Sequence, residues 1–274
     1  REGSGLVKFS KQFPDRYYDV AIAEQHAVTL AAGFACEEKK PVVAIYSTFL
    51  QRAYDQLIHD VAIQNLDVTF ALDRAGLVGE DGPTHSGNYD IAYLRCIPNL
   101  VIMTPANENE TRIMLTTAYN YNGPATVRYP RGSGPNIEVD SGLPSLEIGK
   151  ANLVREGSSD VIFLNFGSLL HEAIEVSENL DLTLIDMRFV KPIDKDILRK
   201  FLPKAKIFIS LEDASIAGGA GSSIQEFCAE ENIAIKSKLL GIPDKFIDHS
   251  SREEMIEEVG LTAKQIEETL KQLI

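Results

Sequence analysis

The sequence predicts an α/β protein of two domains, each built on a mainly parallel sheet flanked by helices. Runs rich in Val, Ile and Phe recur along the chain. Each is followed by a longer segment with helical periodicity, which is the pattern of parallel strands joined by crossover helices. The 274 residues exceed what one hydrophobic core usually serves. Residues 131–146 are rich in Gly, Ser and Pro and lack periodicity, so we predict domains at 1–142 and 143–274.

The first half alternates strands and helices in a regular order. Apolar runs predict strands at 41–46, 67–72, 100–103 and 125–129. Apolar residues at helical spacing predict helices at 51–64 and 107–121. Residues 24–35 carry small or apolar side chains on nearly every side, so we expect there a helix that is buried throughout.

The second half repeats this alternation without repeating the sequence. Its predicted strands lie at 161–166, 182–185, 207–211 and 234–239. Its predicted helices lie at 171–179, 194–201, 220–231 and 262–273. Glutamates between residues 253 and 258 recur at helical spacing, which is typical of a solvated helix face.

Composition and charge exclude several classes of protein. Hydrophobic residues make up 44% and charged residues 24% of the chain, as is typical of a globular protein. No apolar run reaches membrane-spanning length and no segment has signal-peptide order, so we expect no membrane partner and a cytoplasmic location. A formal net charge of −13 argues against binding to nucleic acid, which requires a basic face.

Signals for metal and dinucleotide sites are weak. Cys36, Cys96 and Cys228 lie far apart and have no second Cys or His at metal-ligand spacing. We therefore expect reduced, mostly buried thiols and no metal ligated by this chain. The glycine-rich run 218–222 is only part of a dinucleotide-binding fingerprint, so a tight strand-to-helix connection is the preferred interpretation.

The run Asp19–His26 brings one carboxylate, that of Glu24, into the start of the apolar helix. Ionised glutamates are rarely buried unless they are paired. One interpretation is an acid at the helix N-terminus, where the helix dipole favours negative charge. The other is a carboxyl kept in an apolar site to share a proton with a ligand. From this stretch alone the first interpretation is favoured, because acids at helix starts are common.

Two further segments follow predicted strands, at the edge where open α/β sheets bind ligands. Phe49, in the segment Tyr46–Arg52, is suited to stack on a flat ring, although core packing is the commoner use of an isolated aromatic residue. After another strand, Arg131 is free to reach an anion. Pairing of Arg128 and Arg131 with surface acids is an equally good interpretation.

A long loop rich in Gly and polar residues runs from Asp73 to Asn88. Loops this long inside a compact domain are usually functional. Asp81 and His85 lie four residues apart in it, and a His beside an acid can move protons or orient a substrate oxygen. The alternative is a self-bonded turn. Function is modestly favoured, because a polar residue in such a loop has little structural reason to be there.

Several short motifs together resemble the 1-deoxy-D-xylulose-5-phosphate synthase family of transketolase-like enzymes, which depend on thiamine diphosphate. They occur in order along essentially the whole chain, at 19–26, 46–56, 73–76, 81–85, 93–98, 128–132, 186–192 and 218–221. By this resemblance, the first half is a pyrimidine-binding domain and the second half a transketolase C-terminal domain.

The resemblance implies a cofactor, thiamine diphosphate with Mg²⁺. Glu24 corresponds to the family glutamate that hydrogen-bonds the aminopyrimidine ring, Phe49 to the ring-stacking residue and Arg52 to a neighbouring pocket residue. In the family, an N-terminal domain that precedes these two holds the diphosphate and the metal. Its Gly-Asp-Gly motif and later Asn do not occur here in that context, and the chain opens on Arg1 without a Met. We therefore expect a fragment of a longer protein, although a removed tag would give the same beginning.

The resemblance also implies substrates and their contacts. Tyr46, Arg74 and Arg131 match residues assigned to the phosphate of the acceptor, D-glyceraldehyde 3-phosphate. Asp81 and His85 match positions near the reacting carbon, with hydrogen-bonding or proton-transfer roles. The donor is pyruvate, and the products are CO₂ and 1-deoxy-D-xylulose 5-phosphate, a precursor for isoprenoid, thiamine and pyridoxal biosynthesis.

Two classes of function follow. The first is a fragment of this synthase, inactive alone, whose partners are its own N-terminal domain and a second copy in the homodimer usual for the family. The second is a stand-alone chain, either the beta-type subunit of a split thiamine-diphosphate enzyme or a non-catalytic assembly module. A beta-type 2-oxoacid dehydrogenase subunit is expected to lack the runs at 46–52 and 81–85 in this form.

Overall fold

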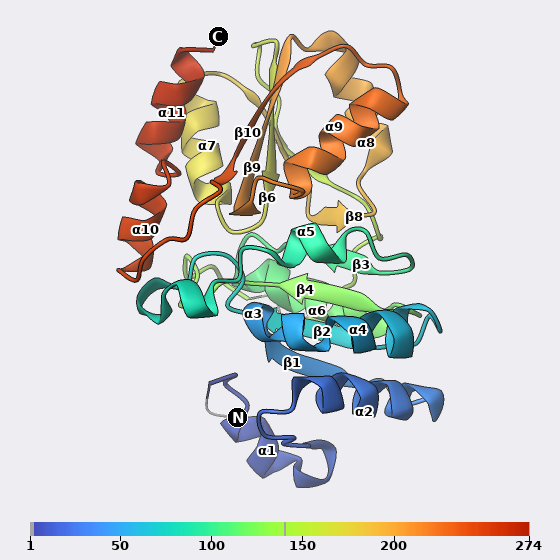
Figure 1. Cartoon of the computed structure of the whole chain (residues 1–274). Coiled ribbons are helices and arrows are strands. Elements are labelled where there is room, and N and C mark those ends of the chain that lie inside the picture. Colours follow the sequence, from blue (N-terminus) through green and yellow to red (C-terminus); the bar gives the residue numbers. More distant parts are fainter. Residues whose placement is uncertain (1–2, 140, 274) are drawn as a thin grey trace.

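The computed structural model describes residues 3–139 and 141–273 as two five-stranded sheets with helices packed on them (Figure 1). The strand order is β1-β2-β4-β3-β8 in the first sheet and β10-β9-β6-β7-β5 in the second. In each sheet four neighbouring strands are parallel and one edge strand is antiparallel. The predicted class, two α/β domains with mainly parallel sheets, is confirmed, while the exact boundary after residue 142 stays a prediction.

The first sheet contains all four strands predicted in the first half, and one strand that was not predicted. Its strands are β1 (Val42–Tyr46), β2 (Thr69–Asp73), β4 (Ala125–Arg128), β3 (Val101–Met103) and β8 (Phe189–Lys191). β8 comes from the second half of the sequence and pairs antiparallel with β3, with Lys191 opposite Ile102. Backbone hydrogen bonds therefore tie the second half to the edge of the first sheet.

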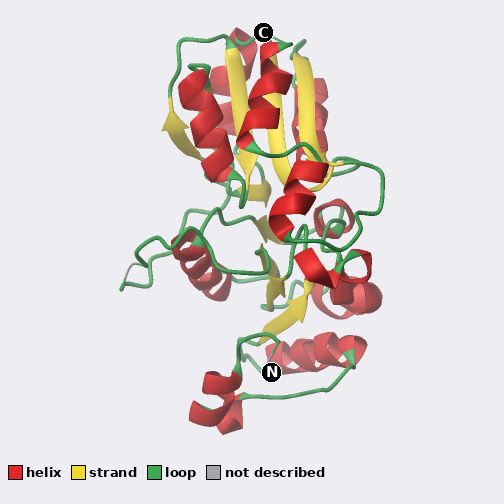
Figure 2. Cartoon of the chain, turned by 90° about the vertical axis from the view of Figure 1, so that its left-hand side faces the viewer, coloured by secondary structure: helices red, strands yellow, loops and turns green. Residues whose placement is uncertain are grey.

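The second sheet is covered by helices on both faces (Figure 2). Its strands are β5 (Asn152–Arg155), β6 (Val161–Phe166), β7 (Thr183–Asp186), β9 (Ile207–Ser215) and β10 (Lys236–Ile242). β5, an antiparallel edge strand, was not predicted. β9 runs past its predicted end at residue 211, so Glu212 and Asp213 belong to the strand and are buried.

The longer predicted helices are confirmed, and the segment after β1 is more irregular than expected. The helices are α1 (Val7–Gln12), α2 (Glu24–Cys36), α3 (Ser47–Leu50), α4 (Tyr54–Gln56), α5 (Asp90–Leu94), α6 (Glu108–Asn120), α7 (Leu170–Asn179), α8 (Lys195–Phe201), α9 (Ala220–Glu230), α10 (Arg252–Glu258) and α11 (Ala263–Lys271). Between β1 and β2, α3 and α4 are joined and followed by 3₁₀ and π turns at Gln51–Ala53 and Leu57–Ala62. Within the described ranges, no helix is long and apolar enough to cross a membrane.

The prediction that the helix at 24–35 is buried throughout is wrong. Only one face of α2 is buried, through Val28, Ala31 and Ala32, and this face packs on the turn at Leu57–Ala62. The residues of the opposite face are exposed, among them Gln25, His26, Thr29, Gly33 and Cys36. α2 lies beside β1 at the outer edge of the first sheet, with α1 and the segment that joins it to α2 farther out (Figure 1). The Tyr18 ring of that segment lies 4.9 Å from the Phe34 ring of α2, between centroids.

The expectation of mostly buried thiols is also wrong for two of the three cysteines. Cys36 and Cys96 are exposed, and only Cys228 is buried. Cys36 ends α2 on its uncovered side, while Cys96 follows the short helix α5. All three are free thiols, as expected.

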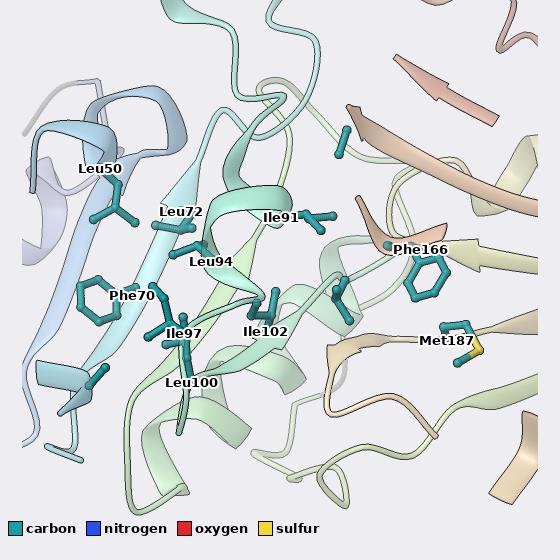
Figure 3. Packing of buried hydrophobic residues seen from close by; sticks show 14 of the residues in the cluster. Leu50, Phe70, Leu72, Ile91, Leu94, Ile97, Leu100, Ile102, Phe166 and Met187 are labelled. Atoms are coloured by element: carbon teal, nitrogen blue, oxygen red, sulfur yellow. The ribbon is translucent and has the colours of Figure 1, made fainter. Parts of the chain in front are cut away.

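One hydrophobic cluster extends across both halves of the chain. It includes Leu50, Phe70 and Ile102 of the first half together with Phe166 and Met187 of the second (Figure 3). Burial of apolar surface stabilises a fold by about 25 cal/mol per Å² removed from water. A cluster shared between the sheets therefore opposes their separation.

Glu212 is a buried carboxyl at the end of this shared core. Its two oxygens accept hydrogen bonds from the backbone N–H groups of Ala220 (2.7 Å) and Gly221 (2.9 Å) at the start of α9. The glycine-rich run at 218–222 thus donates hydrogen bonds to Glu212 of the same domain. This agrees with a tight strand-to-helix connection. Burial raises the pKa of Glu212 to about 7, although these hydrogen bonds and the nearby Arg128 oppose the rise.

We predict that Glu212 makes the protein less stable as the pH rises from about 5 to about 7. In this window the folded chain keeps the proton that the unfolded chain has lost, so the free energy of unfolding falls by at most about 1.4 kcal/mol per pH unit. Urea unfolding at several pH values measures this slope. Glu212→Gln removes it, whereas Glu175→Gln on the exposed face of α7 leaves it in place; an unchanged slope in Glu212→Gln contradicts the assignment.

Candidate functional site

Glu24 is the first residue of α2, and a tight turn directs it there. The backbone N–H of Ala21 donates to Oδ1 of Asp19 (3.0 Å), and Ala21 adopts a left-handed conformation with φ of 56°. The Glu24 side chain is 12% exposed, and its Oε1 accepts a hydrogen bond from Nη1 of Arg52 at 2.7 Å. Glu24 thus lies in the first turn of the helix, as the first interpretation expects, and its carboxylate pairs with Arg52. Proton sharing with a ligand stays a prediction.

Phe49 lies on α3, which follows directly from the carboxyl end of β1. Its ring stacks on that of Tyr46, with centroids 5.2 Å apart and an interplanar angle of 16°. The Arg52 guanidinium lies 5.2 Å from the Phe49 centroid. The His85 ring packs edge-to-face with Phe49, with ring centroids 5.4 Å apart. Phe49 is partly exposed and also packs against the shared core, so it is both a core contact and an aromatic surface.

The loop after β2 is closed at its base by two backbone hydrogen bonds. Gly76 N–H donates to Gly87 O (2.9 Å) and Gly87 N–H donates to Gly76 O (3.0 Å). The loop between them carries Asp81 and His85. Asp81 pairs with Arg74, whose Nε lies 3.2 Å from Oδ2, while His85 Nδ1 lies 2.9 Å from Thr84 Oγ1. The structure therefore places both residues at the site without the direct Asp–His pair that their spacing suggested.

Two arginines meet at Asp81. Arg74 follows β2 in a left-handed conformation (φ 58°), and its Cζ lies 3.8 Å from the centroid of the Tyr46 ring. Arg131 follows β4, and its Nε lies 3.5 Å from Oδ2 of Asp81. Arg131 also forms an ion pair with Glu80. Both guanidinium groups are thus held at one place by acids of the loop.

Arg128 has a different role from Arg131. Its side chain is buried, and Nε donates to Oδ2 of Asp90 (2.8 Å), which is completely buried. The sequence leaves surface pairing open for both arginines. That interpretation is wrong for Arg128, because β4 ends beneath α5 and its guanidinium pairs in the interior.

A cavity of about 640 Å³ opens beside the two arginines. Its walls come from the first residues that the structure describes, the ends of β2 and β4, the loop and the start of α10. The charged residues that line it are Asp73, Arg74, Glu80, Arg131, Arg252 and Glu253. Burial raises the pKa of Asp73 even though Arg74 lies beside it.

The predicted site residues thus form one continuous surface. Glu24 contacts Arg52, Arg52 covers Phe49, and Phe49 stacks on Tyr46. The Arg74 guanidinium lies over the Tyr46 ring and pairs with Asp81, which also pairs with Arg131. The sequence does not indicate Asp73 or Arg252 as site residues. Arg252 gives no signal in the sequence beyond the start of an acidic helix, because only the packing of the two halves brings it here.

This surface combines two chemistries. A partly exposed aromatic face beside a carboxylate suits a flat heteroaromatic ring that carries N–H groups. Two guanidinium groups beside a tyrosine suit a phosphate, which their fork of N–H donors binds well. In the part of the chain that the structure describes, no group of three His, Cys, Asp or Glu side chains is placed to hold a metal ion.

Comparison with protein families divides the chain into two parts. Residues 1–136 match the family model described as the transketolase pyrimidine binding domain, and residues 149–266 match that of the transketolase C-terminal domain. These ranges agree with the two sheets except at β8, which lies in the second range but pairs with β3 of the first sheet.

Curated relatives match nearly the whole chain. The chain is 61% identical over 270 residues to 1-deoxy-D-xylulose-5-phosphate synthase of Hahella chejuensis, covering 98% of this chain and 42% of that protein. It is 60% identical over 267 residues to the same enzyme of Stutzerimonas stutzeri, covering 97% of this chain and 42% of that protein. The chain thus spans less than half the length of the curated relatives it matches.

A solved structure shares the fold. A chain described as a split gene transketolase, in an inactive beta4 tetramer, superposes with a TM-score of 0.87 at 28% sequence identity. The match covers 98% of this chain and 88% of that one.

Proposed function

Because this chain belongs to the 1-deoxy-D-xylulose-5-phosphate synthase family and carries its transketolase-type pyrimidine-binding and C-terminal domains, we propose that it forms one side of that synthase's active site. The reaction condenses pyruvate with D-glyceraldehyde 3-phosphate to 1-deoxy-D-xylulose 5-phosphate and CO₂. The observation that carries the proposal is the continuous surface from Glu24 through Phe49 to Arg131. Its two ends match a ring cofactor and a phosphorylated acceptor.

The proposed cofactor is thiamine diphosphate, and the chemistry of these side chains fits its aminopyrimidine ring. When bound, the cofactor supplies the carbon nucleophile that adds to pyruvate and takes up the electrons released with CO₂. Phe49 offers the ring a flat contact. Arg52 contacts Oε1 of Glu24, which leaves Oε2 to share a proton with a ring nitrogen.

The acceptor lies at the other end of the proposed site. Arg74 and Arg131 bind its phosphate with Tyr46, and the phosphate competes with Asp81 for their N–H donors. Asp81 and His85, on the closed loop, then orient the aldehyde oxygen or move its proton. His85 lies against Phe49, so this step takes place next to the ring of the cofactor.

The diphosphate and Mg²⁺ are proposed to bind mainly to the N-terminal domain of the family, which precedes the matched region. The relatives are more than twice as long as the region matched here, which leaves room for such a domain. The split beta-type subunit is less well supported, because the split transketolase is only 28% identical whereas the synthases are about 60% identical.

We predict that the chain alone does not form a carbon–carbon bond from the two substrates. Adding a separately made N-terminal portion of a synthase, thiamine diphosphate and Mg²⁺ restores the reaction, because the two portions complete the cofactor site. Detection of 1-deoxy-D-xylulose 5-phosphate measures this. Activity of the isolated chain with the cofactor contradicts the need for a second domain.

In that mixture, Glu24→Gln is expected to lower turnover by roughly 100-fold or more, the usual effect of losing a group that holds a reacting proton. The matched control is Glu37→Gln just beyond the other end of α2, which leaves turnover unchanged. Wild-type turnover in Glu24→Gln removes Glu24 from the mechanism.

Arg131→Gln is expected to weaken use of the phosphorylated acceptor. Loss of a charged hydrogen bond costs roughly 1.5–3 kcal/mol, which raises the KM for D-glyceraldehyde 3-phosphate about 10-fold to 100-fold. The KM for unphosphorylated D-glyceraldehyde stays the same, because that substrate makes no phosphate contact. Arg112→Gln on α6 is the control, and equal changes for both aldehydes refute the phosphate role.

We propose that a second copy of this chain covers the exposed face of α2. The face carries two small residues, Gly33 and Cys36, beside the polar Gln25, His26 and Thr29, and the similar split transketolase is described as a tetramer. A Cβ at Gly33 meets no atom within 4 Å, so Gly33→Arg fits the single chain and blocks only an approaching copy. Sedimentation velocity is expected to show weaker self-association for Gly33→Arg but not for Glu175→Arg; equal association of both variants contradicts this interface.

A further inference from the structure

The loop that carries Asp81 and His85 lies directly against the second half of the chain. A Cβ added to Gly76, whose φ is 75°, lies only 2.3 Å from Cγ of Asp213 on β9. Such a distance leaves no room for any side chain. The backbone of the loop therefore touches the Asp213 carboxylate at its first turn.

Two further glycines of the same loop lie against the segment that leads into α10. A Cβ on Gly79 lies 3.5 Å from the backbone nitrogen of Arg252, and one on Gly82 lies 2.9 Å from Cβ of His249. Both glycines have positive φ, 65° and 66°. The loop thus follows the segment before and at the start of α10 along its length.

Asp213 joins the loop to α10 through its carboxylate. It is 2% exposed, and its Oδ1 accepts from the backbone N–H of Leu77 at 3.2 Å. Its Oδ2 accepts from Nη2 of Arg252 at 2.8 Å and from Oγ of Ser168 at 3.4 Å. One carboxylate thereby holds the loop with one oxygen and α10 with the other.

Arg252 is placed to orient this carboxylate. Its Nη2 also lies 3.3 Å from Oγ of Ser168, so two contacts hold the same nitrogen. Its Nε is buried and has no hydrogen-bond partner among the described residues, so the ion pair with Asp213 is its anchor. Without Arg252, the buried charge of Asp213 loses its ion-pair partner, which is costly enough to make the carboxylate turn.

We propose that Asp213, oriented by Arg252, is a positioning residue for the acceptor site. It fixes the loop from Gly76 to His85 and thereby sets where Asp81 stands between Arg74 and Arg131. The identity of the acceptor rests on the proposed function, whereas the positioning of the loop does not. The C-terminal domain, which supplies none of the predicted site residues, then controls the geometry with which the acceptor is held.

The first test is hydrogen exchange of the loop in the chain itself. Asp213→Asn and Arg252→Gln are expected to speed exchange of the amides at 76–85 by about tenfold or more, with α6 and α11 unchanged. Arg252→Lys keeps the charge and restores part of the protection. Arg199→Gln, which breaks the paired contact with Glu231 on the far side of the second domain, is the control. Wild-type exchange in both Asp213→Asn and Arg252→Gln overturns the proposal.

The second test separates positioning from general destabilisation. In the reconstituted mixture, Asp213→Asn and Arg252→Gln are expected to raise the KM for D-glyceraldehyde 3-phosphate at least fivefold while the KM for pyruvate stays within twofold. Equal rises in both KM values indicate loss of folding and count against positioning. If the wild-type mixture has no activity, the proposed function fails, and loop exchange still decides the inference. If Asp213→Asn does not fold, the Arg252→Gln and Arg252→Lys pair gives the same decision.

Discussion

The buried guanidinium of Arg128 is the contact on which the arrangement of the two halves depends. Its Nε pairs with Asp90 at the start of α5, and its Nη2 donates to the backbone oxygen of Asp213 in the other sheet at 2.9 Å. Breaking such a buried pair by removing one partner usually costs about 3–5 kcal/mol, because a charge is left without compensation. This contact therefore holds the end of β4 together with α5 and β9. The shared apolar cluster contains residues of both halves and also opposes their separation.

The candidate site lies where this contact holds the strand ends in place. β1, β2 and β4 are parallel neighbours, so Tyr46, Arg74 and Arg131 leave the sheet at the same edge although they are far apart in sequence. The stacking of Tyr46 on Phe49 then extends the surface to Glu24 on α2. The aromatic end and the arginine-rich end of this surface thus share one sheet edge, which suits the proposed reaction of a ring cofactor with a phosphorylated aldehyde.

The second half supplies none of the predicted site residues and supports the site through packing contacts. β8 completes the first sheet, and Asp213 and the segment before α10 support the glycine loop. At Gly76 and Gly82 the two surfaces approach too closely for a Cβ, and at Gly79 as at those two positions the backbone adopts positive φ, which favours glycine. The loop is therefore rich in glycine for reasons of packing as well as flexibility.

The sequence by itself determined the fold class, most strands, the longer helices and the residue types of the site, because hydrophobic periodicity and strand-end motifs are local signals. Tertiary structure alone decided that β8 joins the first sheet, that α2 has an uncovered face, and that Arg128 is buried while Arg131 faces the cavity. It also paired Asp81 with Arg74 instead of His85, and brought Arg252 to Asp213. These outcomes depend on which surfaces meet across long sequence separations, and no periodicity within a segment encodes that choice.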